Sequence, residues 1–167
     1  MPVTVPQIAF VGRHNSGKTT FLLAVVPHLV GEGLRVGYLK HASAGFEIDH
    51  PMKDSYRVRR SGVLQTIVAG DDHVAVIDDA QASTFGSVVE RYVRADLDLL
   101  LVEGYKREPL PKIEIARAAL GRELLCATDP LLLATVTDFA TGTSVPAFGL
   151  DDAAGVARLI LERVIGR

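Results

Sequence analysis

Residues 12–19 read Gly-Arg-His-Asn-Ser-Gly-Lys-Thr and match the phosphate-binding pattern G-x-x-x-x-G-K-[ST] at every fixed position. Gly12 and Gly17 permit backbone angles that aim successive N–H groups at phosphate oxygens. Lys18 is a point charge for the β- and γ-phosphates and a predicted catalytic residue, and Thr19 offers a hydroxyl to Mg²⁺. The residues predicted to bind the nucleotide here are Gly12, Asn15, Ser16, Gly17, Lys18, Thr19 and Thr20.

A second element must hold the metal ion, and Glu103 has the right position for it. It ends the most apolar run of the chain, residues 97–102, and is followed by Gly104. A buried strand would deliver Glu103 to the carboxyl edge of a parallel sheet, where ligands bind in open α/β folds. We therefore predict Thr19 and Glu103 as the metal-binding residues; the alternative is that Glu103 only ends a strand at the surface.

Two acids in the segment 40–54 are further candidates. Asp49 is predicted to orient either an attacking water, which would make it catalytic, or a water bound to Mg²⁺. An ordinary loop acid is an equal alternative. Asp54 is better explained as the N-cap of a short helix over 54–60.

Several basic residues follow predicted strand ends, where a local positive field suits an anionic, phosphorylated ligand. A solvated charged face is the alternative for any one of them. The candidates for contact with such a ligand are Lys40, His41, Lys53, Lys106 and Lys112.

Asp138 is the candidate for reading a guanine base. A carboxylate accepts from N1–H and the 2-amino group of guanine, and adenine offers no matching pair of donors. The run Thr135-x-x-Asp138 resembles the guanine-reading pattern [NT]-K-x-D, but Val136 replaces its lysine. An acidic turn residue after a strand is the alternative.

Short apolar runs and longer amphipathic runs alternate along the chain, which favours an α/β fold. Strands are predicted at 8–11, 35–39, 64–69, 73–77, 97–102, 131–136 and 145–148, and helices from 18, 54, 81 and 151. Pro27 should kink the first helix or make its last turns irregular. Residues 112–116 alternate polar and apolar, which predicts a hairpin or an edge strand. The run 64–77, with a tight turn at Gly70, predicts an antiparallel portion.

The predicted architecture is one P-loop NTPase-like domain over residues 1–167, with a mostly parallel sheet flanked by helices. The 167 residues carry a net charge of −2, so no strong basic excess points to a nucleic acid. The single cysteine, Cys126, excludes an internal disulfide framework. No apolar run approaches the roughly 18 residues that span a bilayer, and the N-terminus lacks signal-peptide features. A cytoplasmic protein without membrane contact is expected.

Together these motifs resemble the molybdopterin-guanine dinucleotide biosynthesis protein B family (MobB). After the phosphate loop, the resembling stretches are Lys40-His41, Asp49-x-Pro51-x-Lys53-Asp54-Ser55-Tyr56, Gly62 with Gln65-Thr66, 98–106, Pro111-Lys112-Ile113 and Arg117. They follow the family's order over residues 8–138. The chain departs from the family where members often carry further histidines after Lys-His (here 42–45), and at Met52, where they often have glycine.

The resemblance implies a GTP-binding accessory protein with weak, Mg²⁺-dependent GTPase activity. It would assist the guanylyltransferase that joins GMP to molybdopterin in molybdenum cofactor biosynthesis, and it would form a homodimer. Direct contact with molybdopterin stays open. The alternative from another class is a small-molecule kinase that transfers the nucleotide γ-phosphate to a phosphorylated acceptor held by the basic loops.

Overall fold

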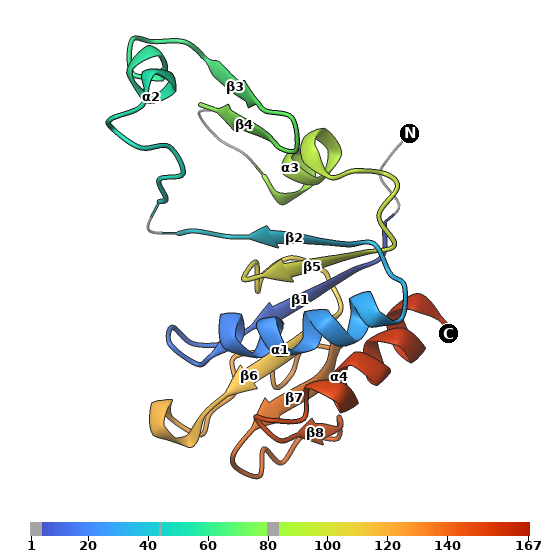
Figure 1. Cartoon of the computed structure of the whole chain (residues 1–167). Helices are drawn as coiled ribbons and strands as arrows, with labels where there is room; N and C mark the ends of the chain where they lie inside the picture. Colours follow the sequence, from blue (N-terminus) through green and yellow to red (C-terminus); the bar gives the residue numbers. More distant parts are fainter. Residues whose placement is uncertain (1–4, 44, 80–83) are drawn as a thin grey trace. The chain divides into compact units, whose positions relative to one another are not determined.

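The computed structural model describes residues 5–43, 45–79 and 84–167 (Figure 1). They form two compact units, which are described separately. The first unit contains the residues up to 41 together with 89–167, and the second contains residues 42–88.

The first unit is built on a six-stranded parallel sheet with the order β2-β5-β1-β6-β7-β8. Its central strand β1 (Gln7–Val11) lies between β5 (Leu99–Glu103) and β6 (Lys112–Ala116). The outer strands are β2 (Val36–Lys40), β7 (Leu132–Thr137) and β8 (Ala147–Phe148). Because all six run in the same direction, the residues that follow their carboxyl ends meet at one edge.

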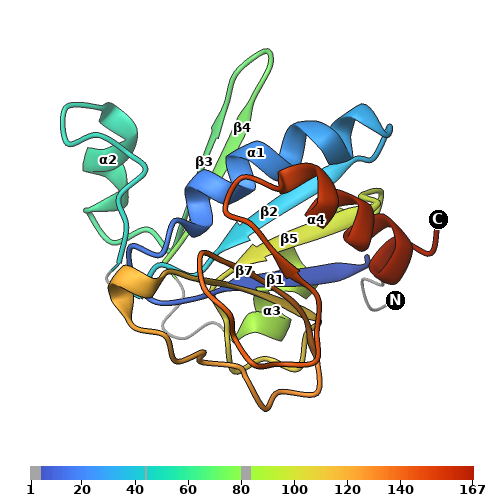
Figure 2. The same ribbon diagram turned by 90° about the horizontal axis from the view of Figure 1, so that it is seen from below.

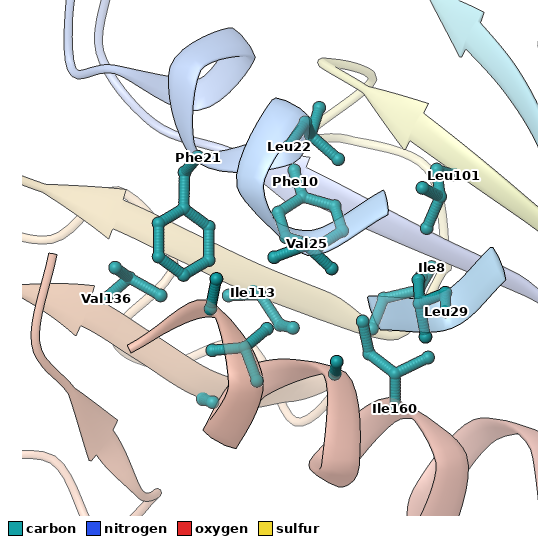
Figure 3. Packing of buried hydrophobic residues seen from close by; sticks show 14 of the residues in the cluster. Ile8, Phe10, Phe21, Leu22, Val25, Leu29, Leu101, Ile113, Val136 and Ile160 are labelled. Carbon is teal, nitrogen blue, oxygen red and sulfur yellow. The ribbon is translucent and has the colours of Figure 1, made fainter. Parts of the chain in front are cut away.

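One face of this sheet carries the main hydrophobic core. Ile8 and Phe10 of β1 alternate onto this face with Leu101, Ile113 and other fully buried side chains of the neighbouring strands. Helices α1 (Lys18–Gly31) and α4 (Ala153–Ile160) pack side by side against them (Figures 2 and 3). This burial fixes the start of α1, and therefore the phosphate loop, against the end of β1.

Helix α1 follows the predicted pattern with one difference. Helical spacing predicts an apolar face of Leu22, Val25, Val26 and Leu29. Leu22, Val25 and Leu29 are buried together with Phe21, and Val26 is half-buried. The helix continues as an α-helix through Pro27 to Gly31, so the irregular last turns expected from the proline do not occur.

Strand β6 corrects the prediction of a hairpin or edge strand for residues 112–116. It lies inside the sheet, parallel to β1 and β7, and all five residues are buried. Its polar residues have partners on the face opposite to the main core. Lys112 pairs with Asp129 at 2.9 Å, and the Glu114 carboxylate accepts from the backbone N–H groups of Leu125 and Cys126. The alternation therefore reflects two buried faces, one of them polar.

The second unit contains α2 (Asp54–Arg59), the strands β3 (Gln65–Ala69) and β4 (Val74–Asp78), and the start of α3 (Phe85–Tyr92). The antiparallel hairpin is confirmed, but it forms a sheet of its own. Lys53, rather than Asp54, is the N-cap residue of α2; Asp54 is the first helical residue. Of the helix predicted from residue 81, residues 81–83 lie outside the described part of the chain.

The mostly parallel sheet flanked by helices confirms the predicted fold class. The last helix also begins as predicted, since the Asp152 side chain accepts from the Gly155 N–H and caps α4. Across the described residues, no helix is long and apolar enough to cross a bilayer.

Candidate functional site

Residues 12–17 connect β1 to α1, and Lys18 and Thr19 begin the helix. Three residues of this loop have backbone angles that favour glycine. Gly12 has φ 150°, Gly17 has φ 93°, and Asn15 has φ 60°, a left-handed value that is uncommon outside glycine. A Cβ on Gly12 would lie 2.3 Å from the carbonyl oxygen of Ile115. The loop is thus pressed against β6 at its first glycine, and glycine is required there.

The Lys18 side chain folds back over this loop. Its Nζ donates to the carbonyl oxygens of Arg13 at 2.8 Å and Gly12 at 3.2 Å. Burial lowers the pKa of Lys18, and the neighbouring Glu103 carboxylate works against that shift. Two carbonyl oxygens therefore hold the ammonium at the loop, where its positive charge would attract a bound anion.

Thr19 and Glu103 meet at the edge of the sheet, as the sequence predicted. The hydroxyl of Thr19 donates to both carboxylate oxygens of Glu103 at 3.0 Å. Parallel pairing of β1 with β5 sets Glu103 beside Phe10, one strand away from the loop. Glu103 itself is 5% exposed, so its carboxylate is buried and faces the start of α1.

Two side chains of β2 complete the surroundings of Glu103. The Tyr38 hydroxyl donates to Oε2 at 2.6 Å, and the Lys40 ammonium lies 3.2 Å from Oε1. Burial alone would raise the pKa of Glu103, but the hydrogen bonds from Tyr38, Lys40 and Thr19 outweigh it and hold that pKa below its ordinary value of 4.5. Glu103 is therefore ionised at neutral pH. Burial, together with the bond to Glu103, raises the pKa of Tyr38 in turn.

We expect Tyr38→Phe to raise the pKa of Glu103, because it removes a short hydrogen bond to the ionised carboxylate. A lowered folded-state pKa stabilises the protein above the unfolded-state value, and that contribution is lost as the pH falls through the folded-state value. The melting temperature of Tyr38→Phe should therefore lie further below wild type at neutral pH than at about pH 3.

Carboxyl ¹³C titration of Glu103 and thermal unfolding across this pH range measure both effects. The matched control is Tyr56→Phe, whose ring lies against Arg59 in the second unit, and it should leave the Glu103 titration unchanged. An unaltered Glu103 titration in Tyr38→Phe would contradict the assigned role of its hydroxyl.

The residues present fit a phosphate chain with a magnesium ion. Ser16 is buried, and its hydroxyl oxygen has no hydrogen-bond partner among the described residues. A bound phosphate could supply the missing hydrogen bond. The hydroxyl of Thr19 and the carboxylate of Glu103 are the hard oxygen ligands that Mg²⁺ prefers. The other predicted loop residues, Asn15 and Thr20, are exposed.

His41 and Lys106 follow the ends of β2 and β5 at the same edge of the sheet. The backbone N–H of His41 donates to the Glu103 carbonyl oxygen at 2.9 Å, and its ring lies 4.6 Å from that of Tyr105. Gly104 approaches His41 closely, since an added Cβ would lie 3.1 Å from the His41 Cβ. Lys106 is exposed.

The structure argues against Lys112 as a ligand for an anion. Lys112 is the first residue of β6 and pairs with Ala9 in the middle of β1, not with the end of β1 that leads into the phosphate loop. Its Nζ is bonded to the Asp129 carboxylate and to the carbonyl oxygens of Glu108 and Leu110. Its ammonium is thus saturated and buried, which is a structural role.

Asp49 and Lys53 belong to the second unit. Asp49 Oδ1 accepts from the His50 N–H at 2.9 Å and from the Ser55 hydroxyl at 3.1 Å. Its other oxygen is buried and has no partner among the described residues. Lys53 is exposed at the start of α2. The catalytic role predicted for Asp49 remains a prediction.

Asp138 follows β7 at the carboxyl edge of the sheet. It is exposed, and its Oδ1 accepts from the backbone N–H of Ala118 at 2.7 Å. This bond joins the end of β7 to the segment that follows β6. This position fits both alternatives for Asp138, an acidic turn residue and a carboxylate that reads the base.

Sequence reasoning missed the roles of two residues at this site. The sequence around Tyr38 carries no motif. Its one signal is that residues two apart on a strand share a face, so Tyr38 lies on the same face as Lys40, which pairs with Glu103. Arg117 directly follows β6, and its Nε donates to the carbonyl oxygen of Ser16 at 3.1 Å. Its place after a strand end was visible, but its contact with the phosphate loop depends on β6 lying next to β1.

These features define a P-loop α/β protein of the NTPase type. They are a parallel sheet, a glycine-containing loop between its central strand and a helix, and an acidic residue at the end of the adjacent strand. Residues 7–138 match the model of the family MobB, "Molybdopterin guanine dinucleotide synthesis protein B". The chain therefore belongs to the MobB family.

Individual relatives agree with this assignment. The molybdopterin-guanine dinucleotide biosynthesis adapter protein of Escherichia coli (strain K12) is 33% identical over 162 residues, covering 95% of this chain and 93% of that protein. The protein of the same name from Haemophilus influenzae is 32% identical, covering 81% and 76%. The crystal structure of Bacillus subtilis MobB has a TM-score of 0.78 at 26% identity and covers 97% of this chain and 99% of its own.

Proposed function

We propose that this protein is a GTP-binding adapter in the biosynthesis of the molybdopterin-guanine dinucleotide form of the molybdenum cofactor. The observation that carries the nucleotide part is the pairing of the phosphate loop with Glu103 through Thr19 at 3.0 Å. The cofactor pathway is supported by the family and by the names of relatives from Escherichia coli and Haemophilus influenzae. A cytoplasmic location fits such a role.

In this proposal the chain binds and orients the triphosphate with its own groups. Backbone N–H groups of the loop and the Lys18 ammonium hold the phosphates, and Thr19 and Glu103 would hold Mg²⁺. The bound ion would neutralise charge on the phosphate oxygens. The Lys40 ammonium, 3.2 Å from Glu103 Oε1, adds a further positive charge beside those of Lys18 and the metal ion. Asp49 is proposed to orient water for a slow hydrolysis, in line with an adapter whose partner performs the main chemistry.

The proposed partner is the guanylyltransferase that attaches GMP to molybdopterin. Lys53 and Lys106 are exposed, and His41 presents its ring at the sheet edge, so these residues are the remaining candidates for a phosphorylated pterin. The family model spans residues 7–138 and so includes all of the second unit and most of the first, which supports treating the chain as one functional domain.

The hairpin of the second unit supports the proposed homodimer. An isolated two-stranded hairpin is marginal in water, and neither strand pairs with a third within the described residues. Large apolar side chains are exposed on both of its faces, with Ile67 at 60% and Val68 at 46%. A second copy would cover them. Light scattering of wild type and Ile67→Asp tests this, because the substitution should shift the protein toward monomer.

Calorimetric titration with GTP and ATP, with and without Mg²⁺, tests the proposed function. We expect GTP to bind more tightly than ATP, and Mg²⁺ to strengthen binding. Asp138→Asn should lower the affinity for GTP by about tenfold, which corresponds to the loss of roughly one hydrogen bond to a charged group. The same variant should bind xanthine nucleotide in preference to GTP. Asparagine keeps an acceptor for the Ala118 N–H, so the loop should remain in place.

Equal affinity for GTP and ATP would contradict the assignment of the base. An unchanged base preference in Asp138→Asn would move guanine reading to another residue. Fast γ-phosphoryl transfer to a small acceptor would replace the adapter with the small-molecule kinase.

A further inference from the structure

Arg117 contacts the phosphate loop from the neighbouring strand. It directly follows β6, whose carboxyl end lies beside that of β1 because Glu114 pairs with Val11. Its Nε donates to the Ser16 carbonyl oxygen at 3.1 Å. The guanidinium also covers Gly17, since a Cβ added there would lie 3.1 Å from Nη2.

This contact sets the orientation of one peptide group in the loop. The carbonyl of Ser16 and the N–H of Gly17 belong to the same planar trans peptide and point in opposite directions. When Arg117 holds the carbonyl, the Gly17 N–H is directed away from the guanidinium. A phosphate cradle depends on successive N–H groups that point to one side of the loop.

The local backbone does not secure this orientation by itself. Gly17 is the N-cap of α1 with φ 93° and has no side-chain cap, and glycine adopts many backbone conformations at little cost. Asn15 adds a second left-handed residue two positions earlier. Backbone hydrogen bonds hold the peptides on either side, through the Ser16 N–H and the Gly17 carbonyl, and the contact from Arg117 holds the Ser16–Gly17 peptide between them.

The Arg117 guanidinium has no acidic partner among the described residues. Across the described residues, no carboxylate lies within ion-pair distance of its guanidinium, although Arg35, Arg59 and Arg94 all have such partners. Arg13, the arginine of the loop itself, is exposed and makes one long contact of 3.5 Å to the Glu123 carbonyl oxygen. Of the two arginines, Arg117 is the one engaged with the loop backbone.

We propose that Arg117 is a positioning residue that holds the Ser16–Gly17 peptide in the orientation that binds phosphate. It acts through the backbone, without contact to the γ-phosphate. The proposal rests on the proposed nucleotide function of the same loop. Because the cradle surrounds the β-phosphate, GDP and GTP depend on Arg117 to the same degree.

The test compares Arg117→Met and Arg117→Lys with wild type. The matched control is Arg122→Met, whose guanidinium lies over the Phe139 ring and contacts no loop residue in the described structure. Calorimetry gives the dissociation constants of GDP and GTP, and ¹H–¹⁵N spectra follow the Gly17 amide in the protein without nucleotide. Melting temperatures report on the overall fold.

We expect Arg117→Met to lower the affinities for GDP and for GTP by the same factor of about ten. This factor corresponds to roughly one hydrogen bond from a charged donor. The Gly17 amide signal should move in the absence of nucleotide. Arg117→Lys should recover part of the affinity, because an ammonium can donate to the same carbonyl, and the control should match wild type.

Four results would overturn the proposal. Unchanged affinity in Arg117→Met is one, and a loss confined to GTP is another, since it would indicate contact with the γ-phosphate. The third is a parallel loss of melting temperature and affinity that lysine does not restore, which would make Arg117 merely structural. If wild type binds neither nucleotide, the proposed function fails, while an unmoved Gly17 amide in Arg117→Met would still refute the positioning role.

Discussion

Lys18→Ala is expected to weaken nucleotide binding by two orders of magnitude or more, about 2.7 kcal/mol. The half-buried Lys18 ammonium lies at the loop, bonded to the carbonyl oxygens of Gly12 and Arg13, whereas the arginine of the loop, Arg13, is exposed. Burial already lowers its pKa, so a bound anion would restore a favourable partner to a charge that the protein has partly desolvated.

The measurement is the GTP dissociation constant by calorimetry, with melting temperature as the check on folding. Lys40→Ala is the informative comparison. Its ammonium contacts Glu103 and is half-exposed, so its removal should cost less. Equal losses for Lys18→Ala and Lys40→Ala would indicate a diffuse electrostatic effect, and an unaltered Lys18→Ala would refute the phosphate-loop assignment.

Gly12→Ala is expected to have the second largest effect, on both folding and binding. Its Cβ would lie 2.3 Å from the Ile115 carbonyl oxygen and 2.7 Å from the Ser16 hydroxyl oxygen. A backbone carbonyl in the central part of a sheet cannot move aside as a flexible side chain can. The loop must therefore withdraw from β6, and a strained backbone of this kind costs about 1–3 kcal/mol.

Denaturant unfolding and GTP titration together measure this change, and the chain offers a matched control. Gly31 lies at the far end of α1, the helix that follows the loop, and nothing lies within 4 Å of an added Cβ there. Gly31→Ala should stabilise the helix by up to about 1 kcal/mol. If both alanine variants behaved alike, the close approach of Gly12 to β6 would have no energetic consequence.

The elements closest to the phosphate chemistry were predictable because their signals are local. Residues 12–19 carry their pattern in eight consecutive positions. The amphipathic spacing of Leu22, Val25, Val26 and Leu29 predicted the helix that follows. The run before Glu103 predicted a buried strand, and parallel strands end at a common edge. Those facts were enough to expect Thr19 and Glu103 at one site.

Polar residues inside the sheet were not predictable in the same way. Lys112 and Glu114 alternate with isoleucines, and this alternation predicted a hairpin or an edge strand. Their partners, Asp129 and the N–H groups of Leu125 and Cys126, come from a later segment that covers this face. Periodicity records which residues share a face, but it does not record whether that face meets water or other polar groups.

By itself, then, the sequence determined the phosphate loop, the fold class and the acid at the end of β5, because each is encoded by neighbouring residues. The tertiary structure alone decided that Tyr38 and Lys40 hold Glu103 and that Arg117 holds Ser16. These contacts join residues 63 to 101 positions apart. They exist because the strand order places β5 between β2 and β1 and places β6 on the other side of β1, an order that no local pattern specifies.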